Sequence, residues 1–434
     1  AESVRENPRP ILIEFKTFRL RGHEEASGTK YVPKELLELW QAKDPISNFE
    51  QYLLKTAVLT NEIIDQYTLD IKKEINAHLE VAFEEEKIIP NVASELEDVY
   101  KTFNYKAIVP AEKKKKIRFV DAISDGLRQS MEKYNDLVIM GQDVAAYGGV
   151  FKVTDGFVAQ FGKARVRNTP ICESAIVAAA YGLSVNGMKA VMEMQFADFV
   201  SSGFNPIVNL LAKSHYRWGE KAAVVIRMPC GAGVGAGPFH SQTNEAWFTK
   251  TPGLKVVYPA FPQDAKGLLA AAIDDPNPVL FFEHKGLYRS IYQEVSENHF
   301  TLEIGKANQL KTGAHISIIT YGAGVHWALE TLAKNPLISA DLIDLRTLQP
   351  LDIETIYRSV KKTGKAIVLQ EDSLFGGISS DISALITENC FHYLDAPVKR
   401  VGSLETPIPF QGDLENQYLA KNSFENDLKA LLNY

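Results

Sequence analysis

Short apolar runs alternate with helix-length segments from Ile117 to the end of the chain. A first series of β-branched runs lies at 137–140, 190–192, 223–226, 255–258 and 279–282. A second series lies at 316–320, 340–344, 366–369 and 398–401. Runs that are apolar on both faces and separated by helices are typical of a parallel sheet covered on both sides. The pattern therefore predicts the α/β class, with two consecutive parallel-sheet domains.

The N-terminal part follows a different pattern. Residues 10–20 are expected to form a β-strand, followed by a polar, glycine-containing loop at 19–28. Apolar residues then recur at spacings of three and four, which predicts helices after Pro33, after Asp44 and from Thr60. The last helix carries an apolar stripe of Ile63, Tyr67, Ile71, Ile75, Leu79 and Phe83. We expect a helical arm that docks through one buried face.

A charged segment at 106–116, which ends in four lysines, separates the arm from the sheet domains. This shift in composition predicts a linker. A nucleic-acid or nuclear-localisation role for the lysines is disfavoured, because no aromatic residues interleave with them and the chain is acidic. The expected domains are an arm at 1–105, the linker at 106–116, a first sheet domain at 117–305 and a second at 306–434.

Composition excludes several classes of protein. With 434 residues, of which 45% are hydrophobic and 23% charged, the chain can bury two or three cores. The 47 Lys and Arg against 54 Asp and Glu give a net charge of −7, which offers no attraction for nucleic acid or acidic lipid. The three cysteines form no Cys-x-x-Cys pair, which favours reduced thiols in a reducing compartment. We expect a small molecule or another protein as partner.

The N-terminus carries no targeting signal that we can identify. No apolar run approaches the roughly 18 residues of a membrane span, and the first residues have neither a signal-peptide core nor a transit-peptide composition. We therefore expect a cytoplasmic protein that does not enter a membrane. The chain lacks an initiator Met and reaches the apolar run at 11–15 almost at once, so we expect it to begin inside a larger fold.

Two segments carry candidate chemistry in the first sheet domain. Glycine occupies positions 231, 233, 235 and 237, shortly before His240 and Gln242, in a spacing that fits neither a dinucleotide fingerprint nor a P-loop. Such a loop is either a chance feature or a close-approach loop that delivers His240 to a cleft as a proton donor. Glu173 is the single carboxylate in an apolar stretch that begins a helix. It is either a first-turn helix residue or a semi-buried carboxylate with a raised pKa, able to share a proton with a heterocycle nitrogen.

A third candidate lies in the N-terminal loop. His23 is close in sequence to Arg19 and Arg21, and the group is either a solvated loop or an anion site for a phosphate. The residues by themselves leave both alternatives open.

Taken in order, these segments resemble the thiamine-diphosphate-dependent 2-oxo acid dehydrogenases, the decarboxylase components of branched-chain and pyruvate type complexes. The match to the β subunit runs from about Ile117 to Tyr434. Its motifs are Gly-Gln-Asp-Val at 141–144, Tyr-Gly-Gly-Val-Phe at 147–151, Arg-Asn-Thr-Pro-Ile-Cys-Glu at 167–173, Glu-Met-Gln-Phe-Ala-Asp-Phe at 193–199, Phe-His-Ser-Gln at 239–242, Pro-Gly-Leu-Lys-Val-Val at 252–257, Asn-Pro-Val-Leu-Phe-Phe-Glu at 277–283, Asp-Leu-Arg-Thr at 344–347 and Glu-Thr-Pro at 405–407. Residues 1–105 resemble the C-terminal end of the α subunit, through the loop at 18–23 and Lys-Asp-Pro-Ile at 43–46. The resemblance implies a fused α–β chain that has lost most of the α part.

The resemblance also implies a role for each candidate. In the family, the carboxylate matching Glu173 hydrogen-bonds the aminopyrimidine of the cofactor and promotes loss of the thiazolium proton. Phe199 matches the aromatic ring against that pyrimidine, and Gln195 matches a polar residue near it. The residue matching His240 manages protons during acyl transfer to the lipoyl arm. Two matches in the α-like part, Arg19 and His23, are expected near the diphosphate and the substrate carboxylate.

Metal sites follow from the same resemblance. A potassium-type site would use backbone oxygens of Ala222, Val224, Val225, Ala272 and Asn277, with the carboxylate of Asp275. The family's Gly-Asp-Gly…Asn motif for Mg²⁺ and the diphosphate is absent, because the segments at 124–126 and 154–156 lack the first glycine. The Mg²⁺ ligands are therefore expected outside this chain. Glu24 replaces a serine, so phosphorylation there is not expected, and Gln-Glu-Asp at 370–372 replaces a His-Glu-Ala run.

The leading hypothesis is oxidative decarboxylation of a branched-chain 2-oxo acid such as 3-methyl-2-oxobutanoate. The acyl group would pass to the lipoyl group of a dihydrolipoyl acyltransferase, and the fused chain would form a homodimer equivalent to α2β2. The branched-chain preference rests on the segment at 195–199, which is closer to the branched-chain pattern. A pyruvate or acetoin type dehydrogenase, a transketolase-like enzyme and a non-catalytic assembly module remain as alternatives.

Overall fold

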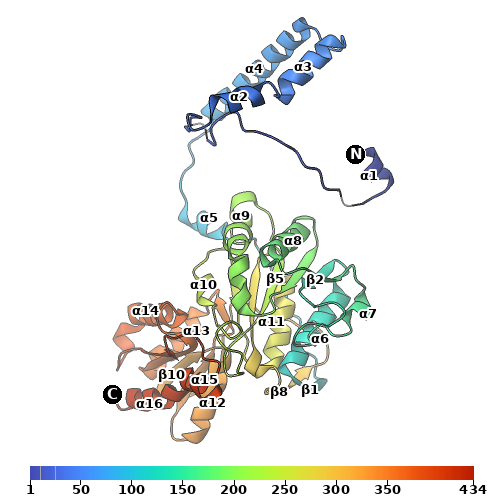
Figure 1. The fold of residues 1–434 in the computed structure, drawn as a ribbon. Helices are drawn as coiled ribbons and strands as arrows, with labels where there is room; N and C mark the ends of the chain where they lie inside the picture. The colour runs from blue at the N-terminus through green and yellow to red at the C-terminus, as the bar shows by residue number, and fades with distance from the viewer. Residues whose placement is uncertain (10, 25) are drawn as a thin grey trace. The chain divides into compact units, whose positions relative to one another are not determined.

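The computed structural model describes residues 1–9, 11–24 and 26–434, drawn in Figure 1. The chain divides into two compact units, Ala1–Pro90 and Asn91–Tyr434. Residues 91–105, which we expected in the arm, belong to the second unit. The hydroxyl of Tyr100 donates to the carbonyl of Leu254 at 3.0 Å, and the amide of Lys101 donates to Oδ1 of Asn277 at 2.8 Å.

Unit 1 contains the predicted helices. They are α2 (Lys34–Gln41), α3 (Pro45–Lys55) and α4 (Asn61–Glu84), preceded by a short α1 (Glu2–Glu6). The Asp44 side chain caps α3 and the Thr60 hydroxyl caps α4, as the sequence predicts. The expected strand at 10–20 is wrong. Residues 11–20 form no strand, since no described segment pairs with their backbone, and residue 10 lies outside the described residues.

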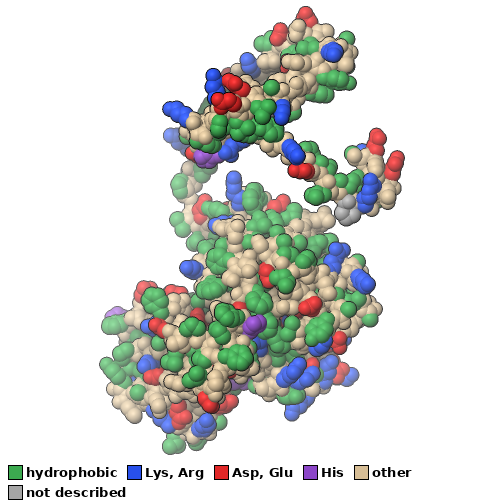
Figure 2. All heavy atoms as spheres, viewed as in Figure 1, with side chains coloured by type: hydrophobic (Ala, Val, Ile, Leu, Met, Phe, Trp, Pro, Cys, Tyr) green, Lys and Arg blue, Asp and Glu red, His purple; other side chains and the backbone are tan. Residues whose placement is uncertain are grey.

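The apolar stripe of α4 is exposed within unit 1, so the expected docking through this face stays a prediction. Ile71 is 56% exposed and Phe83 is 83% exposed. Figure 2 shows hydrophobic side chains on the surface of this helical unit. Helices α3 and α4 line an open apolar groove with a volume of about 660 Å³.

The larger sheet of unit 2 has seven strands in the order β12-β6-β7-β5-β4-β2-β3. Its strands are β2 (Leu137–Gly141), β3 (Val166–Asn168), β4 (Lys189–Glu193), β5 (Val224–Cys230), β6 (Lys255–Val257), β7 (Val279–His284) and β12 (Thr347–Gln349). All neighbours are parallel except β12 and β6. Side chains of β2 alternate between two cores, with Val138 in one and Ile139 in the other. This arrangement confirms the parallel sheet covered on both faces.

Helices cover the two faces of this sheet. The first core includes α8 (Glu173–Val185), and the second includes α6 (Phe119–Lys133) and α11 (Pro262–Asp274). The remaining helices of this part are α5 (Val92–Glu97), α7 (Phe157–Phe161), η1 (Ala197–Gly203), η2 (Pro206–Leu211), α9 (Ser214–Trp218), α10 (Ala246–Thr249) and η3 (Lys285–Leu287).

The second sheet has five strands in the order β14-β13-β10-β11-β9. Its strands are β9 (Asn308–Lys311), β10 (Ile316–Thr320), β11 (Ala340–Asp344), β13 (Ala366–Ser373) and β14 (Lys399–Ser403). Its helices are α12 (Ala323–Lys334), α13 (Ile353–Thr363), α14 (Ile378–Cys390), η4 (Phe391–Tyr393), α15 (Gly412–Tyr418) and α16 (Lys421–Leu432). All pairs are parallel except β9 with β11. The four runs predicted for this domain are therefore confirmed as strands.

Two features tie the parts of unit 2 together. Strand β12 follows β11 in the chain and yet joins the first sheet, and one hydrophobic core contains residues of both sheets, such as Met192 and Ile319. The second feature is a ribbon of β1 (Lys114–Arg118) and β8 (Tyr292–Ser296). Three of the four lysines of the expected linker are thus strand residues.

Candidate active site

The candidate residues gather where the parallel strands of the first sheet end. Open α/β sheets bind ligands beyond the carboxyl ends of their strands. Gln142 and Asp143 follow β2, Gln195 follows β4 after one residue, the glycine-rich loop follows β5, and Lys285 follows β7. The topology therefore brings four separate segments to the carboxyl ends of neighbouring strands.

Glu173 is the first residue of α8 and is half-buried. Its position suits a carboxylate, because unpaired amides and the helix dipole make a helix start electropositive. Nε2 of Gln142 donates to Oε1 of Glu173 at 3.1 Å. The sequence motif at 141–144 pointed to this segment, but not to a role for Gln142. The contact identifies Gln142 as the residue that orients the carboxylate.

An aromatic cluster surrounds His240. Its ring centroid lies 4.7 Å from that of Phe196 and 5.6 Å from that of Phe199, both in edge-to-face geometry. Phe199 belongs to η1, which packs against the start of α8. A methyl group built on Gly203 of η1 would lie 3.7 Å from the carbonyl carbon of Glu173. The structure thus gathers the segments that carry Glu173, Phe199 and His240.

Gln195 contacts a residue with unusual backbone geometry. Its Nε2 donates to Oδ2 of Asp143 at 3.3 Å, and Asp143 has a φ of 59°, in the left-handed region. Such a conformation is costly for a residue other than glycine and persists where neighbours enforce it, often at functional sites. Sequence reasoning did not assign Asp143 a role. Asp adopts this conformation more readily than most residues, but its identity alone does not show that it does so here.

Asp198 anchors the segment after His240. Its Oδ1 accepts from the amides of Ser241 at 3.2 Å and Gln242 at 3.3 Å. Burial raises the pKa of Asp198, against the effect of these two amides and of Lys285. Oδ2 of Asp198 and the hydroxyl of Ser241 are buried and have no hydrogen-bond partner among the described residues. Polar atoms left in this state favour a site that receives a polar ligand.

These residues fit the pyrimidine half of thiamine diphosphate. A flat heteroaromatic ring needs an apolar wall, which Phe196 and Phe199 can provide, and hydrogen-bonding groups at its edge. Glu173 and the orphaned oxygens of Asp198 and Ser241 are groups of that type. The fit extends to the pyrimidine only.

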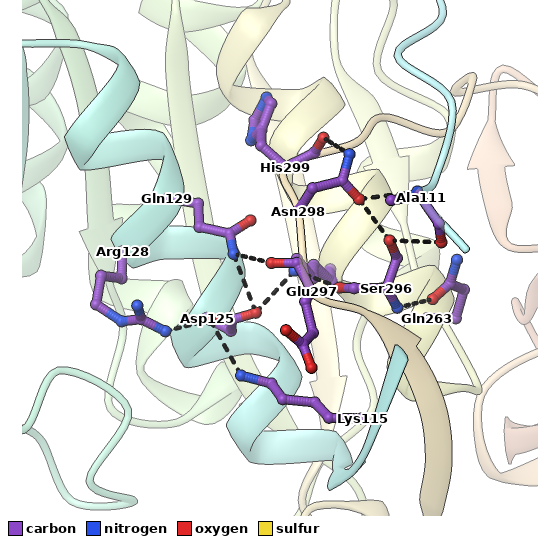
Figure 3. A network of polar contacts seen from close by, with 11 residues as sticks. Ala111, Lys115, Asp125, Arg128, Gln129, Gln263, Ser296, Glu297, Asn298 and His299 are labelled. Atoms are coloured by element: carbon purple, nitrogen blue, oxygen red, sulfur yellow. Dashed lines mark hydrogen bonds and ion pairs between the residues drawn. The ribbon is translucent and has the colours of Figure 1, made fainter. Parts of the chain in front are cut away.

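The sequence segments nearest to the diphosphate motif have other roles. Asp125, in the segment at 124–126, is 3% exposed, and its Oδ2 accepts a hydrogen bond from Nζ of Lys266 at 2.7 Å. Arg128 also contacts Asp125, and Nζ of Lys115 lies 3.8 Å from Oδ1 of Asp125. Figure 3 shows both side chains pointing toward Asp125. Asp125 is therefore saturated with cationic partners. Among the described residues, no cluster of three His, Cys, Asp or Glu side chains is arranged to hold a metal ion.

Three residues of the expected potassium-type site, Asp275, Asn277 and Ala222, already have hydrogen-bond partners. Nζ of Lys255 lies 2.5 Å from Oδ2 of Asp275, and both the amide and the side chain of Asn277 donate to Oδ1 at 2.9 Å. The backbone oxygen of Ala222 accepts from Val224 at 2.7 Å. A cation would have to share Asp275 with the Lys255 ammonium, so this geometry does not favour a prepared cation site.

Arg19 and His23 lie in unit 1 and are exposed there. Nε2 of His23 lies 3.4 Å from the hydroxyl of Ser27 and 3.8 Å from Oε1 of Glu24. Each residue therefore lies in a solvated loop within its own unit. Their expected role near a diphosphate stays a prediction.

Comparison with known proteins assigns the family. Residues 1–91 match the model described as Dehydrogenase E1 component, residues 115–290 match Transketolase, pyrimidine binding domain, and residues 305–423 match Transketolase, C-terminal domain. The 2-oxoisovalerate dehydrogenase subunit beta of Bacillus subtilis is 44% identical over 307 residues, covering 69% of this chain and 94% of that protein. The chain belongs to the E1 components of the 2-oxo acid dehydrogenases. Its family is thiamine-diphosphate dependent and consists of oxidoreductases.

Other relatives bear on specificity and fold. The pyruvate dehydrogenase E1 component subunit beta of Bacillus subtilis is also 44% identical, over 296 residues, covering 67% of this chain and 91% of that protein. The split gene transketolase, inactive beta4 tetramer, is 23% identical with a TM-score of 0.60, and the match covers 73% of this chain and 98% of that one. That structure supports the fold alone.

The comparisons confirm the α/β fold class, the E1 family and the joining of an α-type segment to a β-type segment in this chain. They leave the choice between branched-chain substrates and pyruvate open, because both names occur at the same identity. Among the described residues, no helix is long and apolar enough to cross a membrane.

Proposed function

We propose that this E1 chain acts in the oxidative decarboxylation of branched-chain 2-oxo acids, with acyl transfer to the lipoyl group of a dihydrolipoyl acyltransferase. The observation that carries the proposal is the gathering of the Glu173, Phe199 and His240 segments at the strand ends of the first sheet. Thiamine diphosphate, when bound, supplies a nucleophilic carbon and an electron sink.

In this proposal each side chain has a defined task. Glu173 holds a proton at a pyrimidine nitrogen, and Gln142 keeps its carboxylate in place. Phe199 orients the ring, with Gln195 beside it. His240 moves a proton when the acyl group leaves for the lipoyl arm.

The rest of the cofactor site needs the α-type part. Arg19 and His23 would bind near the diphosphate and the substrate carboxylate, as charge-assisted donors suit both groups. Mg²⁺ would be held by residues outside this chain. A potassium-type ion at Asp275 would have to coexist with Lys255, so activity is expected to respond little to K⁺. The proposal includes a homodimer in the cytoplasm, which light scattering and cell fractionation test.

The substrate assignment is tested with the full-length protein that carries this chain, supplied with thiamine diphosphate and Mg²⁺. Reduction of an artificial electron acceptor is followed with 3-methyl-2-oxobutanoate and with pyruvate. We expect kcat/KM to be about tenfold higher for the branched-chain acid, the scale of discrimination by a few methylene contacts. Faster turnover of pyruvate would overturn the assignment. Turnover of neither acid by a folded protein would favour the assembly module.

A further inference from the structure

The alternating glycines of the loop after β5 have a conformational explanation. Gly231, Gly233, Gly235 and Gly237 have φ values of 93°, 85°, 69° and 71°, whereas no residue between them has a positive φ. Alternation between left-handed and ordinary backbone turns successive amides toward one side, which forms a concave anion-binding nest. Glycine at every second position is what this geometry needs, because other residues pay for a positive φ.

The nest is filled by a carboxylate of the second sheet domain. Oε1 of Glu415, in α15, accepts from the amides of Gly233 at 2.8 Å and Val234 at 3.3 Å, and Oε2 accepts from Gly235 at 2.9 Å. Glu415 is only 4% exposed. The acceptor carboxylate is therefore buried, whereas the three donor residues lie at the surface. Hydrogen bonds to an ionised acceptor are about twice as strong as those between neutral groups.

A second carboxylate extends the contact by one residue. Oε1 of Glu371, at the end of β13, accepts from the amide of Ala232 at 2.6 Å. Its Oε2 lies 2.6 Å from Nε2 of His284. Because Nδ1 of His284 accepts from the amide of Gly286 at 3.1 Å, Nε2 is the donor to Glu371. Four consecutive amides of the loop are thus bound by carboxylates of the other domain.

The same loop leads directly to His240. Beyond it, Asp198 binds the amides of Ser241 and Gln242. His240 is therefore held between two anchored segments, the nest on one side and Asp198 on the other. A displacement of about 1 Å at a reacting group can cost on the order of 100-fold in rate.

We propose that Glu415 is a positioning residue for His240. Its carboxylate fills the glycine nest and makes the placement of His240 depend on the docking of the second sheet domain. This inference rests on the proposed function of His240 in acyl transfer.

The test compares Glu415→Ala and Glu415→Gln with a control, Asp413→Ala, in the full-length protein. Asp413 lies on the same helix and is exposed, and its side chain accepts a hydrogen bond from Nε2 of Gln411. Hydrogen exchange of the amides at 233–235 is expected to be about tenfold faster or more in Glu415→Ala, because these three amides lose their acceptor. Glu415→Gln keeps an acceptor oxygen and should give an intermediate rate, and the control should match the wild type.

Activity is measured as two half-reactions, decarboxylation with an artificial acceptor and acyl transfer to a lipoylated domain. Glu415→Ala is expected to slow acyl transfer by about tenfold or more and decarboxylation by less than about twofold. Added formate, a carboxylate small enough for the emptied nest, should restore acyl transfer. If Glu415→Ala fails to fold, Glu415→Gln serves in the exchange and half-reaction measurements without formate, where smaller changes of the same kind are expected.

The outcomes separate this inference from the proposed function. Unchanged exchange at 233–235 in Glu415→Ala refutes the nest, whatever the enzyme catalyses. Equal loss of both half-reactions without rescue by formate makes Glu415 merely structural and refutes the positioning role. If the wild type converts no 2-oxo acid, the proposed function fails. The positioning role is then tested by the rate at which diethyl pyrocarbonate modifies His240. Faster reaction in Glu415→Ala, reversed by formate, supports positioning, and an unchanged rate refutes it.

Discussion

Replacing Arg227 by Met tests the energetics of the buried charges beneath the site. Arg227 lies in β5 and is completely buried. Its Nε and Nη2 donate to the two oxygens of Glu283, each at 2.7 Å, and Nη1 donates to Glu193, also at 2.7 Å. Glu193 ends β4 two residues before Gln195, so the cluster supports the strand ends that carry the candidate site.

The size of the effect follows from what the substitution leaves behind. Met fills much of the volume, but two buried carboxylates lose their shared cation. Removing one partner of a buried ion pair costs about 3–5 kcal/mol, because the remaining charge is uncompensated. We therefore expect the free energy of unfolding at pH 8 to fall by about that amount.

The loss should also depend on pH. Burial raises the pKa of Glu193 above its usual range, while Arg227 opposes the rise and Glu283 adds to it. A carboxyl group whose pKa is raised on folding stabilises the fold at low pH and loses that contribution as pH increases. Without Arg227 the pKa of Glu193 must rise further. The variant should therefore be closer to the wild type at pH 5 than at pH 8.

Urea unfolding at pH 5, 6.5 and 8, followed by circular dichroism, measures the effect. Arg118→Met is the matched control, because Arg118 makes a similar two-bonded pair with Asp121 at the surface, with side chains 41% and 39% exposed. A surface pair is worth about 0–1 kcal/mol. The reasoning is refuted if Arg227→Met costs no more than Arg118→Met, or if its cost is the same at all three pH values.

Three further predictions concern single carboxylates. Glu173→Gln should lower decarboxylation by about 100-fold or more, while the urea midpoint stays within error of the wild type, since the side chain is only half-buried; a large loss of stability would contradict this. Burial first, and Asp264 second, raise the pKa of Asp344 to about 8. Stability should therefore fall as pH increases from about 4 to 8. In Asp344→Asn the midpoint of thermal unfolding should depend less on pH over that interval. Asp125→Asn leaves the buried Lys266 ammonium without its anion and should cost about 3–5 kcal/mol in urea unfolding, with turnover per folded molecule unchanged; a selective loss of turnover would point to a catalytic role instead.

Local patterning predicted the regular elements well wherever both faces of a strand are buried. The run at 316–320 became β10 with the same bounds, and the run at 137–140 became β2 with one residue added. The strand expected at 10–20 failed, because a strand also needs a neighbour that periodicity cannot supply. The short β12 was missed for the converse reason, since its pairing with β6 comes from a distant part of the chain.

The candidate site was predicted in part. Motif resemblance pointed to Glu173, Phe199 and His240, and the structure gathers the segments that carry them. It missed Gln142, whose contact with Glu173 depends on how β2 and α8 lie in space. The expected potassium ligands were matched by position only, and the partners of Asp275 became visible only in three dimensions.

The sequence by itself determined the parallel sheets, the family motifs and the glycine spacing, because each depends on residues close together in the chain. Only the tertiary structure decided what the glycine loop binds. Glu371 and Glu415 lie far along the chain from residues 232–235, and no local pattern links them. A hydrogen-bonded carboxylate buried between domains depends on how two folded parts dock. The sequence left two explanations for the loop, a chance feature or a loop that approaches a cleft closely. The docked domains show instead a nest that binds a carboxylate of the neighbouring domain.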